Sequence, residues 1–325
     1  MRKRQFGRTG WSVSEIGFGT WPIGSAWGPV RDAESLDALL GQTYEDFELI
    51  ISDNASTDGT ADICRRYAQQ DSRVRYIRQP RNIGCAPNHN VLVEQARGEL
   101  FKWASDDDLY ARDLIERCIA ALDEYPQVIL AHCWTAMIDS SRTMTKAVRY
   151  TLDTDSPRAP ERFRSMLFEK GGDDDGGVIR MPVLRRIRPY DSYYHSDRTL
   201  VTEMCLQGQF YHVPDWLYFR RDHPESSLNA YPSVRTNCTN LDPHRADRLR
   251  HPVPRLLAEY VLAYVTMIRR APLTPADKRD CYRHLASWAA SRAVPKSIRG
   301  DGETKPDPEA VVSVEAVVAG AGRGA

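Results

Sequence analysis

Three consecutive carboxylates, Asp106, Asp107 and Asp108, stand in the run FKWASDDDLY, directly after an apolar stretch with the character of a buried strand. Like charges at this spacing repel one another unless solvent, backbone donors or a cation compensates. Mg²⁺ and Mn²⁺ favour carboxylate oxygens and keep open positions for the phosphates of a ligand. The triplet therefore predicts a divalent cation between Asp108, with Asp106, and the diphosphate of a nucleotide ligand.

The acidic segments allow two other interpretations. Because Ser and Asp favour helix N-termini, SDDD could instead cap a helix that starts near Arg112. The stretch DNASTDGT has the look of a calcium loop, but Ala55 and Asp58 occupy the third and sixth positions, where such a loop needs an oxygen ligand and Gly. The calcium interpretation is therefore excluded.

The elements that must position these carboxylates alternate between strand and helix from residue 42 to about residue 140. FELII (Phe47 to Ile51) is a continuous apolar run, as in strands buried on both faces of a parallel sheet. Further strands are predicted at VRYIR, FKWA and VILAHCWTAMI, with helices from about Thr60, through Val91 as far as Gly98, and around Leu114 to Leu122. Such alternation predicts a doubly wound α/β sheet, in which SDN and SDDD face one crevice beyond the strand ends.

The second half of the chain is less regular. GGDDDGG reads as a flexible acidic loop, and QFYHVPDWLYFRR as strands. Residues 251–294 read as two amphipathic helices separated by PLTPADK, with Pro275 near the first position of the second helix. The tail is rich in small residues and Gly, which predicts disorder.

Composition narrows the class of protein. The 325 residues include 44 Lys plus Arg and 44 Asp plus Glu, so no global basic field points to nucleic acid. The seven cysteines are scattered without a CxxC pair, which indicates neither a disulfide framework nor a zinc site and suits the cytoplasm. No signal peptide or membrane-spanning helix is predicted. The most apolar run, LLAEYVLAYVTMI, is interrupted by Glu259 and is followed directly by Arg269 and Arg270.

The runs QTYEDFELIISDNASTDGTADIC, NIGCAPNHN and ARGELFKWASDDDLYARDLIE resemble, in order and spacing, the family 2 glycosyltransferases of the GT-A fold over about residues 40–230. The resemblance implies a GT-A-like doubly wound mixed sheet with a Rossmann-like nucleotide-binding half. It also implies an inverting, metal-dependent enzyme that moves a sugar from a nucleotide-diphosphate sugar to a hydroxyl acceptor, with Mn²⁺ or Mg²⁺ as cofactor. The implied acceptor is a saccharide or lipid-linked, as in bacterial surface or extracellular polysaccharide synthesis, with peripheral membrane association.

The resemblance also assigns roles to residues. It places Asp53, in SDN, at the nucleotide base, Asp106 at the nucleoside and Asp108 at the metal. The complete sets that it implies are Asp53, Asn54, Asn82, Asn88, Asp106 and Asp107 for the donor, and Asp108, Asp106 and His223 for the metal. Arg220, Arg221 and His223 are candidates for the diphosphate or the metal shell, with solvated surface as the alternative for the arginines, and Cys85 and His89 are assigned structural roles.

The runs GGVIRMPVLRRI and HSDRTLVTEMCLQGQFYHVPDWLYFRRDHPESS continue the resemblance, which implies that Asp197 is the general base. An acceptor hydroxyl is a poor nucleophile, so a carboxylate must remove its proton as the oxocarbenium-like centre is attacked. The alternative role of Asp197 is a helix N-cap. Asp191 and the acidic loop residues Asp173, Asp174 and Asp175 are rival bases.

The N-terminus departs from this pattern. RQFGRTGWSVSEIGFGTWPIGSAWG, within about residues 1–35, resembles the start of an aldo-keto reductase, so the chain looks like a junction of two genes. A family 2 glycosyltransferase normally begins with a strand of the sheet, and this segment stands in its place. The residues from Ser12 to Phe18 have strand character and are expected to form the first strand, with Thr20 and Trp21 near the nucleotide base. The expected organisation is residues 1–35, a GT-A domain over 36–250, a helical extension over 251–296 and a disordered tail over 297–325.

The sequence is therefore compatible with three functions. The leading one is the glycosyltransferase. The second is a non-catalytic remnant or binding protein of the same fold, whose replaced N-terminus impairs donor binding. The third is an aldo-keto reductase, which predicts a (β/α)₈ barrel.

Overall fold

The computed structural model describes residues 32–148, 150–169, 176–222 and 230–293, the backbone of 4–5, 12–13 and 16–20, and positions 314 and 318. The predicted Asp173, Asp174, Asp175 and His223 and most of the tail lie outside these residues, as does most of the reductase-like segment. Within the described tail positions, Val314 is buried and Val318 packs beside it against the core, so the expected disorder is not found there.

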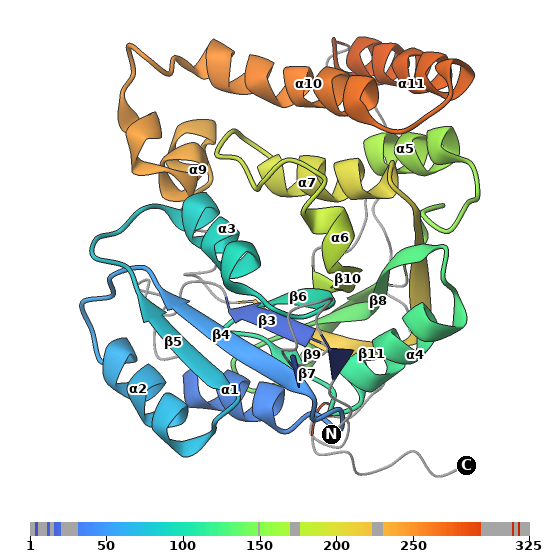
Figure 1. The fold of residues 1–325 in the computed structure, drawn as a ribbon. Coiled ribbons are helices and arrows are strands. Elements are labelled where there is room, and N and C mark those ends of the chain that lie inside the picture. Colours follow the sequence, from blue (N-terminus) through green and yellow to red (C-terminus); the bar gives the residue numbers. More distant parts are fainter. Residues whose placement is uncertain are drawn as a thin grey trace.

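Among the described residues, nine strands form one mixed sheet in the order β5-β4-β3-β6-β10-β8-β11-β7, with β9 on β8 (Figure 1). The strands are β3 (Ile16–Thr20), β4 (Phe47–Asp53), β5 (Val74–Arg78), β6 (Leu100–Ala104), β7 (Leu109–Tyr110), β8 (Val128–Ile138), β9 (Met144–Val148), β10 (Val178–Arg180) and β11 (Gln209–Arg221). A separate antiparallel pair joins β1 (Arg4–Gln5) to β2 (Ser12–Val13). The strands predicted at FELII, VRYIR, FKWA and VILAHCWTAMI are confirmed, and their ends differ from the observed ones by two residues or fewer. QFYHVPDWLYFRR forms a single strand, β11.

The strand β3 takes the position expected for a replaced first strand. It runs parallel to both β4 and β6, so that Ile16 pairs with Phe47 on one side and with Leu100 on the other. The strand covers Ile16–Thr20, whereas Ser12 and Val13, expected in the same strand, belong to the separate pair. The sheet therefore has no gap between β4 and β6.

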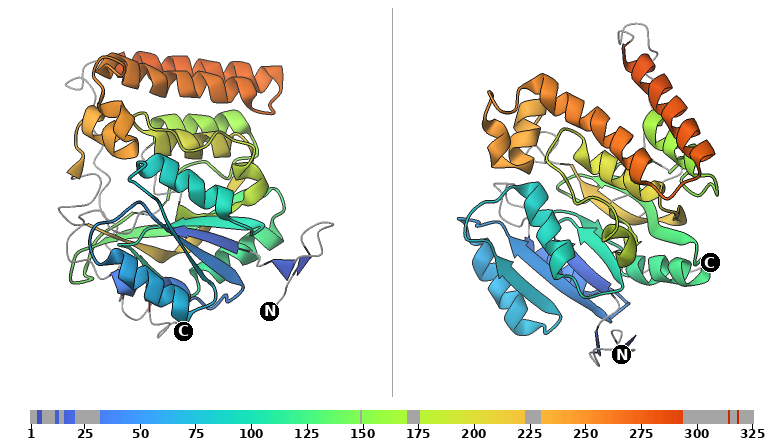
Figure 2. Two further views of the ribbon diagram at one scale, coloured as in Figure 1. Left: turned by 60° about the vertical axis from the view of Figure 1, so that its left-hand side comes forward. Right: turned by 45° about the horizontal axis from the view of Figure 1, so that its top comes forward.

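Helices cover both faces of the sheet (Figures 1 and 2). They are α1 (Asp32–Leu40), α2 (Thr60–Gln70), α3 (Cys85–Gln95), α4 (Leu114–Glu124), α5 (Ala159–Phe168), α6 (Met181–Leu184), α7 (Ser196–Cys205), α9 (Val234–Leu241), η2 (Pro243–Ala246), α10 (Val253–Arg270) and α11 (Pro275–Ala293). The helix predicted near Arg112 starts at Leu114, because the short strand β7 stands between it and the acidic triplet. SDDD therefore does not cap this helix.

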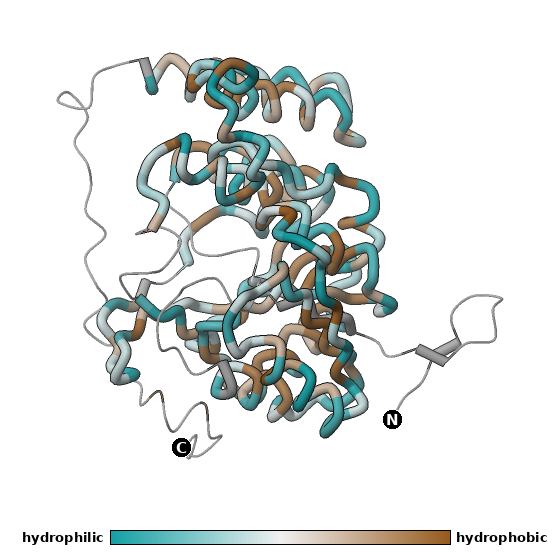
Figure 3. The backbone as a smooth tube through the Cα atoms, turned by 90° about the vertical axis from the view of Figure 1, so that its left-hand side faces the viewer, coloured by the Kyte–Doolittle hydropathy of each residue, from teal (hydrophilic) through white to brown (hydrophobic). Residues whose placement is uncertain are grey.

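The core has three parts. Burial of all seven residues of β4 fits a strand covered on both faces. One cluster joins the sheet to α1, α2 and α4, a second joins it to α3, α6 and α7, and a third lies among α5, α10 and α11. Figure 3 shows the hydrophobic stretches running through the middle of the molecule and recurring in the outermost helices. The two predicted C-terminal helices, α10 and α11, are thus a layer stacked on α7 and α5.

Candidate active site

The carboxyl ends of β4 and β6 meet at one edge of the sheet, because both strands are parallel to β3, which lies between them. Asp53 is the last residue of β4, and the acidic triplet begins two residues after β6 ends at Ala104. The structure therefore brings SDN and SDDD to the same edge, as the alternation of elements predicts.

Asp53 is fully buried. Its carboxylate accepts hydrogen bonds from the backbone N–H of Ser56 at 2.7 Å and the hydroxyl of Tyr76 at 2.6 Å, and it forms an ion pair with Arg78 at 2.9 Å. Burial opposes ionisation, but the hydrogen bonds from Tyr76 and Ser56 and the charge of Arg78 hold the pKa of Asp53 below its ordinary value. The carboxylate shapes the strand end and offers no surface to a base in this conformation.

The predicted asparagines also bind protein groups. Asn54 donates to Asn82 Oδ1 at 3.1 Å and accepts from the backbone N–H of Ile83 at 2.9 Å, which fastens the loop before α3 to the end of β4. Asn88 is fully buried and exchanges two hydrogen bonds with Ser52, at 2.7 and 2.9 Å. Asn54 and Asn82 keep partly exposed surface, whereas Asn88 is a structural tie rather than a ligand contact.

Helix α3 continues this connection toward α7. Asn90 donates to the carbonyl of Tyr190 and accepts from its N–H, both at 2.8 Å, and the buried His89 ring stacks on Tyr190 at 5.2 Å. Gly84, before α3, has a φ of 93°, and a Cβ there would lie 2.5 Å from the Leu241 carbonyl oxygen. Helix α3 therefore fixes the loop that leads into α7, and Gly is required where it begins.

Asp108, the expected metal ligand, is buried. It accepts from the Tyr218 hydroxyl and, at 2.8 Å, from the backbone N–H of Arg221, both on β11. Burial and the nearby charge of Asp107 raise the pKa of Asp108 to about 7, against the opposing charge of Arg220. Asp108 therefore joins the triplet to β11.

Asp106 and Asp107 are only half-buried, and they are the members of the triplet with surface for a cation. Among the described residues, no group of three or more His, Cys, Asp and Glu is arranged to hold a metal. A pair of carboxylates still fits Mg²⁺ or Mn²⁺, since these ions take one or two carboxylates and complete their shell with phosphate oxygens and water. Arg221 is buried and bound to the Asp107 carbonyl and to Glu34, whereas Arg220 is half-buried.

Asp197 is exposed in the first turn of α7, and among the described residues it forms no ion pair. The N-cap of α7 is His195, so the alternative of Asp197 as N-cap is wrong. Burial lowers the pKa of His195, and the charge of Asp197 opposes this change. The carboxylate of Asp197 is therefore accessible, and it accepts a hydrogen bond from the backbone N–H of Arg198 at 2.7 Å.

The thiol of Cys85, at the start of α3, is buried. Burial raises the pKa of Cys85, and the negative charges of Asp197 and Asp106 raise it further. The start of α3 therefore experiences the charge of both the predicted base and the acidic triplet.

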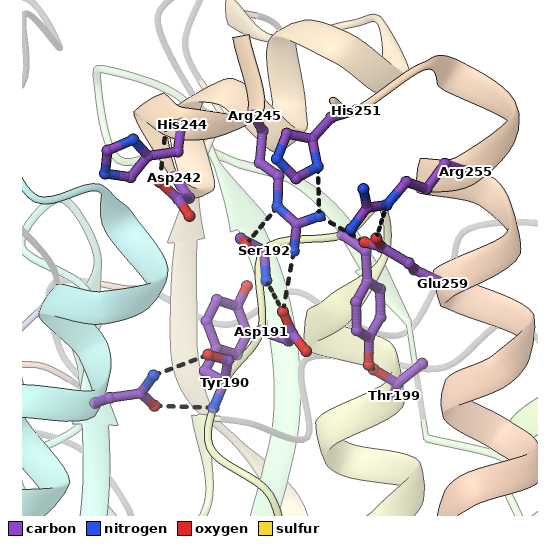
Figure 4. A network of polar contacts seen from close by, with 12 residues as sticks. Tyr190, Asp191, Ser192, Thr199, Asp242, His244, Arg245, His251, Arg255 and Glu259 are labelled. Atoms are coloured by element: carbon purple, nitrogen blue, oxygen red, sulfur yellow. Dashed lines mark hydrogen bonds and ion pairs between the residues drawn. The ribbon is translucent and has the colours of Figure 1, made fainter. Parts of the chain in front are cut away.

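The rival base Asp191 lies in a polar network (Figure 4). Arg245 lies 3.5 Å from Asp191, donates to Ser192 Oγ at 2.9 Å and to Glu259 of α10 at 2.6 Å. His251 Nδ1 is 3.3 Å from the same guanidinium. Asp191 therefore helps to hold the loop before α7 against α10.

Three features of the structure were not predicted. Ala55 and His195 have positive φ angles of 64° and 59°, which side chains other than Gly adopt at a cost. Tyr76 and Arg78 hold Asp53, and their spacing of two residues on β5 is the signal that places them on one face. The buried hydroxyl of Ser196 and the indole N–H of Trp103 lack a hydrogen-bond partner among the described residues.

Comparison with known proteins shows a shared domain. Residues 33–187 match the family model described as Glycosyl transferase family 2. Glycosyltransferase GlyG of Streptococcus pneumoniae is 33% identical over 91 residues, covering 28% of this chain and 30% of the relative. The putative glycosyltransferase EpsH of Bacillus subtilis is 29% identical over 134 residues, covering 41% and 38%. The chain thus spans about a third of the length of these relatives.

A longer match, 25% identical over 206 residues, is to the GalNAc(5)-diNAcBac-PP-undecaprenol beta-1,3-glucosyltransferase of Campylobacter jejuni, covering 61% of this chain and 64% of the relative. Among solved structures, TarS 1-349 of S. aureus superposes with a TM-score of 0.51 at 15% identity, over 86% of this chain and 91% of TarS 1-349. TarS 1-349 in complex with UDP-GlcNAc gives the same TM-score. Residues 33–187, somewhat less than half of the chain, are therefore similar to family 2 glycosyltransferases, and the chain has the fold of the GT-A glycosyltransferases.

Proposed function

We propose that this protein transfers a sugar, with inversion, from a nucleotide-diphosphate sugar to a hydroxyl of a saccharide or lipid-linked acceptor. The observation that carries the proposal is the meeting of Asp53 and the acidic triplet at the edge of the sheet where β4 and β6 end, within the residues that match the family 2 model. The exposed Asp197, in the first turn of α7, would face this edge, since one sugar must contact both the departing diphosphate and the attacking hydroxyl.

Each charged or polar side chain of the site then has a proposed role. Asp106 and Asp107 would hold Mg²⁺ or Mn²⁺, which when bound neutralises charge on the departing nucleoside diphosphate. Arg220 would add positive charge on the same side. Asp197 would take the proton of the acceptor hydroxyl as that oxygen attacks the anomeric carbon, and the bond to the diphosphate breaks on the opposite face. Asp53, Asn54 and Asn82 would shape the loop that receives the nucleoside.

The alternatives have less support. The remnant hypothesis depends on a missing first strand, and β3 fills that position with parallel pairing on both sides. The reductase hypothesis predicts a closed barrel of eight parallel strands, whereas the described strands form a mixed sheet with β7 as its last strand.

A thermal-shift titration tests the proposal. UDP is the first probe, because TarS 1-349 was solved with UDP-GlcNAc. Stabilisation by UDP only when Mn²⁺ is present, with no shift from NADPH, is the expected result. A shift from NADPH alone would favour the reductase, and no shift from any nucleoside diphosphate would favour the remnant. A screen of nucleotide sugars, read by hydrolysis or transfer, would then identify the donor.

A further inference from the structure

Helix α10 carries large apolar side chains on its outer face as well as its inner one. Leu256, Tyr264 and Met267 are buried against neighbouring helices. The described residues with large exposed apolar side chains are Phe168, Leu249, Val253, Leu257, Val261, Leu262, Val265 and Tyr282. All of them except Phe168 and Tyr282 lie on α10 or just before it, and the Tyr282 hydroxyl reaches the Val265 carbonyl at 3.5 Å. We call the set without Phe168 the outer face.

The charges around the outer face are mostly basic. Arg255 lies at its beginning, and Arg269 and Arg270 are exposed at its end. Just before α10, Arg248 and Arg250 are also exposed, and Arg250 lies 3.6 Å from the exposed carboxylate of Asp247. The acidic residue of α10, Glu259, is half-buried and bound to Arg245 and Arg255. An apolar surface with basic ends and no exposed acid on the helix matches an anionic bilayer surface, where acyl chains receive the apolar groups and headgroups the arginines.

We infer that the outer face of α10 docks on anionic membrane lipid, with the helix lying in the plane of the bilayer surface. None of the described helices is long and apolar enough to span a membrane. The described part of the tail does not cover the outer face, since Val314 packs in the cluster formed with α1, α2 and α4. A second copy of the chain is the competing occupant, and its own basic residues would repel those around the outer face.

The inner side of α10 lies against the candidate base. The Tyr260 ring is 5.5 Å from the ring of His195, and the charge of Asp197 reaches Tyr260. Arg245 and Glu259 tie α10 to the loop that precedes α7 (Figure 4). Docking therefore holds Asp197 within about one helix diameter, roughly 10 Å, of the lipid surface. If Asp197 is the general base of the proposed function, its position near the lipid surface identifies the acceptor as a lipid-linked saccharide.

Vesicle flotation without nucleotide or acceptor tests the inference. The intact protein should float with vesicles of equal parts phosphatidylglycerol and phosphatidylcholine, and binding should weaken with salt. Leu257→Gln with Leu262→Gln should weaken binding by about tenfold or more, because apolar contact with the acyl region is lost. Phe168→Gln, which changes an exposed apolar residue away from the outer face, is the matched control and should bind normally.

A second pair of substitutions tests the role of the basic residues. Arg269→Gln with Arg270→Gln should lower the affinity for the anionic vesicles by about tenfold. The control, Arg65→Gln with Arg66→Gln on α2, should leave this affinity unchanged. Failure of the intact protein to float, or flotation unchanged in the leucine variant, would overturn the inference. So would a dimer in solution that the leucine variant dissociates. Because UDP stabilisation is measured separately, failure to float with UDP binding intact leaves the proposed function standing.

Discussion

The sheet edge and the start of α7 carry carboxylates in contrasting surroundings. At the sheet edge, Asp53 and Asp108 are buried, and protein donors bind both oxygens of each. At the start of α7, Asp197 is exposed and, within the described residues, without an ion pair. Asp106 and Asp107 are intermediate. The difference teaches that the buried carboxylates hold the protein's own strands and loops together, whereas the accessible ones are those for which we propose roles in ligand binding and proton transfer.

The strongest test of this comparison is Asp197→Asn. Asn keeps the size and polarity of the side chain but does not accept the acceptor's proton, so turnover should fall by roughly 10²- to 10⁴-fold. Steady-state transfer assays at saturating acceptor, with UDP affinity from calorimetry, measure the two effects apart. Asp191→Asn is the control and should keep most of the activity. Turnover within a few-fold of wild type in Asp197→Asn would remove it from the mechanism.

The next test concerns the accessible members of the triplet. Asp106→Asn combined with Asp107→Asn should weaken Mn²⁺-dependent UDP binding by about tenfold to a hundredfold, because charged contacts to the cation are lost. Calorimetry with and without Mn²⁺ measures the effect. Asp62→Asn, a change at an exposed carboxylate of α2, should have none. Equal metal dependence in the double variant would show that the cation binds elsewhere.

Asp108→Asn should instead act on stability. The amide can satisfy only one of the two donors, Tyr218 and Arg221, so we expect a loss of about 1 to 3 kcal/mol in the free energy of unfolding. The measurement is urea denaturation. UDP binding by the folded variant should keep its dependence on Mn²⁺, and its loss in a stable variant would restore Asp108 as the metal ligand.

The same variant has a pH signature. The pKa of Asp108 is raised to about 7 in the folded protein, from its ordinary value of 3.8. The folded state therefore holds a proton that the unfolded state releases, and this contribution to stability is complete below about pH 4 and is lost as the pH rises to about 7. The stability of the wild type should fall relative to that of Asp108→Asn across this window. Parallel curves would show that Asp108 does not titrate there.

The sequence predicts this fold closely where short-range patterns decide it. VRYIR and VILAHCWTAMI are uninterrupted runs, and the observed strands have the same ends. It could not rank the three aspartates of the triplet, because the backbone N–H that fixes Asp108 comes from Arg221, 113 positions later. The tie between Asn90 and Tyr190 spans 100 positions and leaves no local pattern. Resemblance places residues in a site, but only tertiary contacts show which carboxylates remain accessible.

The smallest expected effect concerns the strained backbone at Ala55. Ala55 follows SDN with a φ of 64°, and a residue with a Cβ pays about 1 to 2 kcal/mol in that conformation. Gly avoids this cost but loses about 0.5 to 1 kcal/mol through the greater freedom of the unfolded chain, so Ala55→Gly should raise stability by about 0.5 to 1 kcal/mol. Ala68→Gly, within helix α2, is the matched control and should lower stability by about 1 kcal/mol. Urea denaturation of both variants measures the difference, and a loss in Ala55→Gly equal to that in Ala68→Gly would show that Ala55 is not strained.

If the UDP affinity of Ala55→Gly falls while its stability rises, the strained turn serves nucleotide binding, because the rigid Ala holds the loop from Asn54 to Ser56 in place for the ligand.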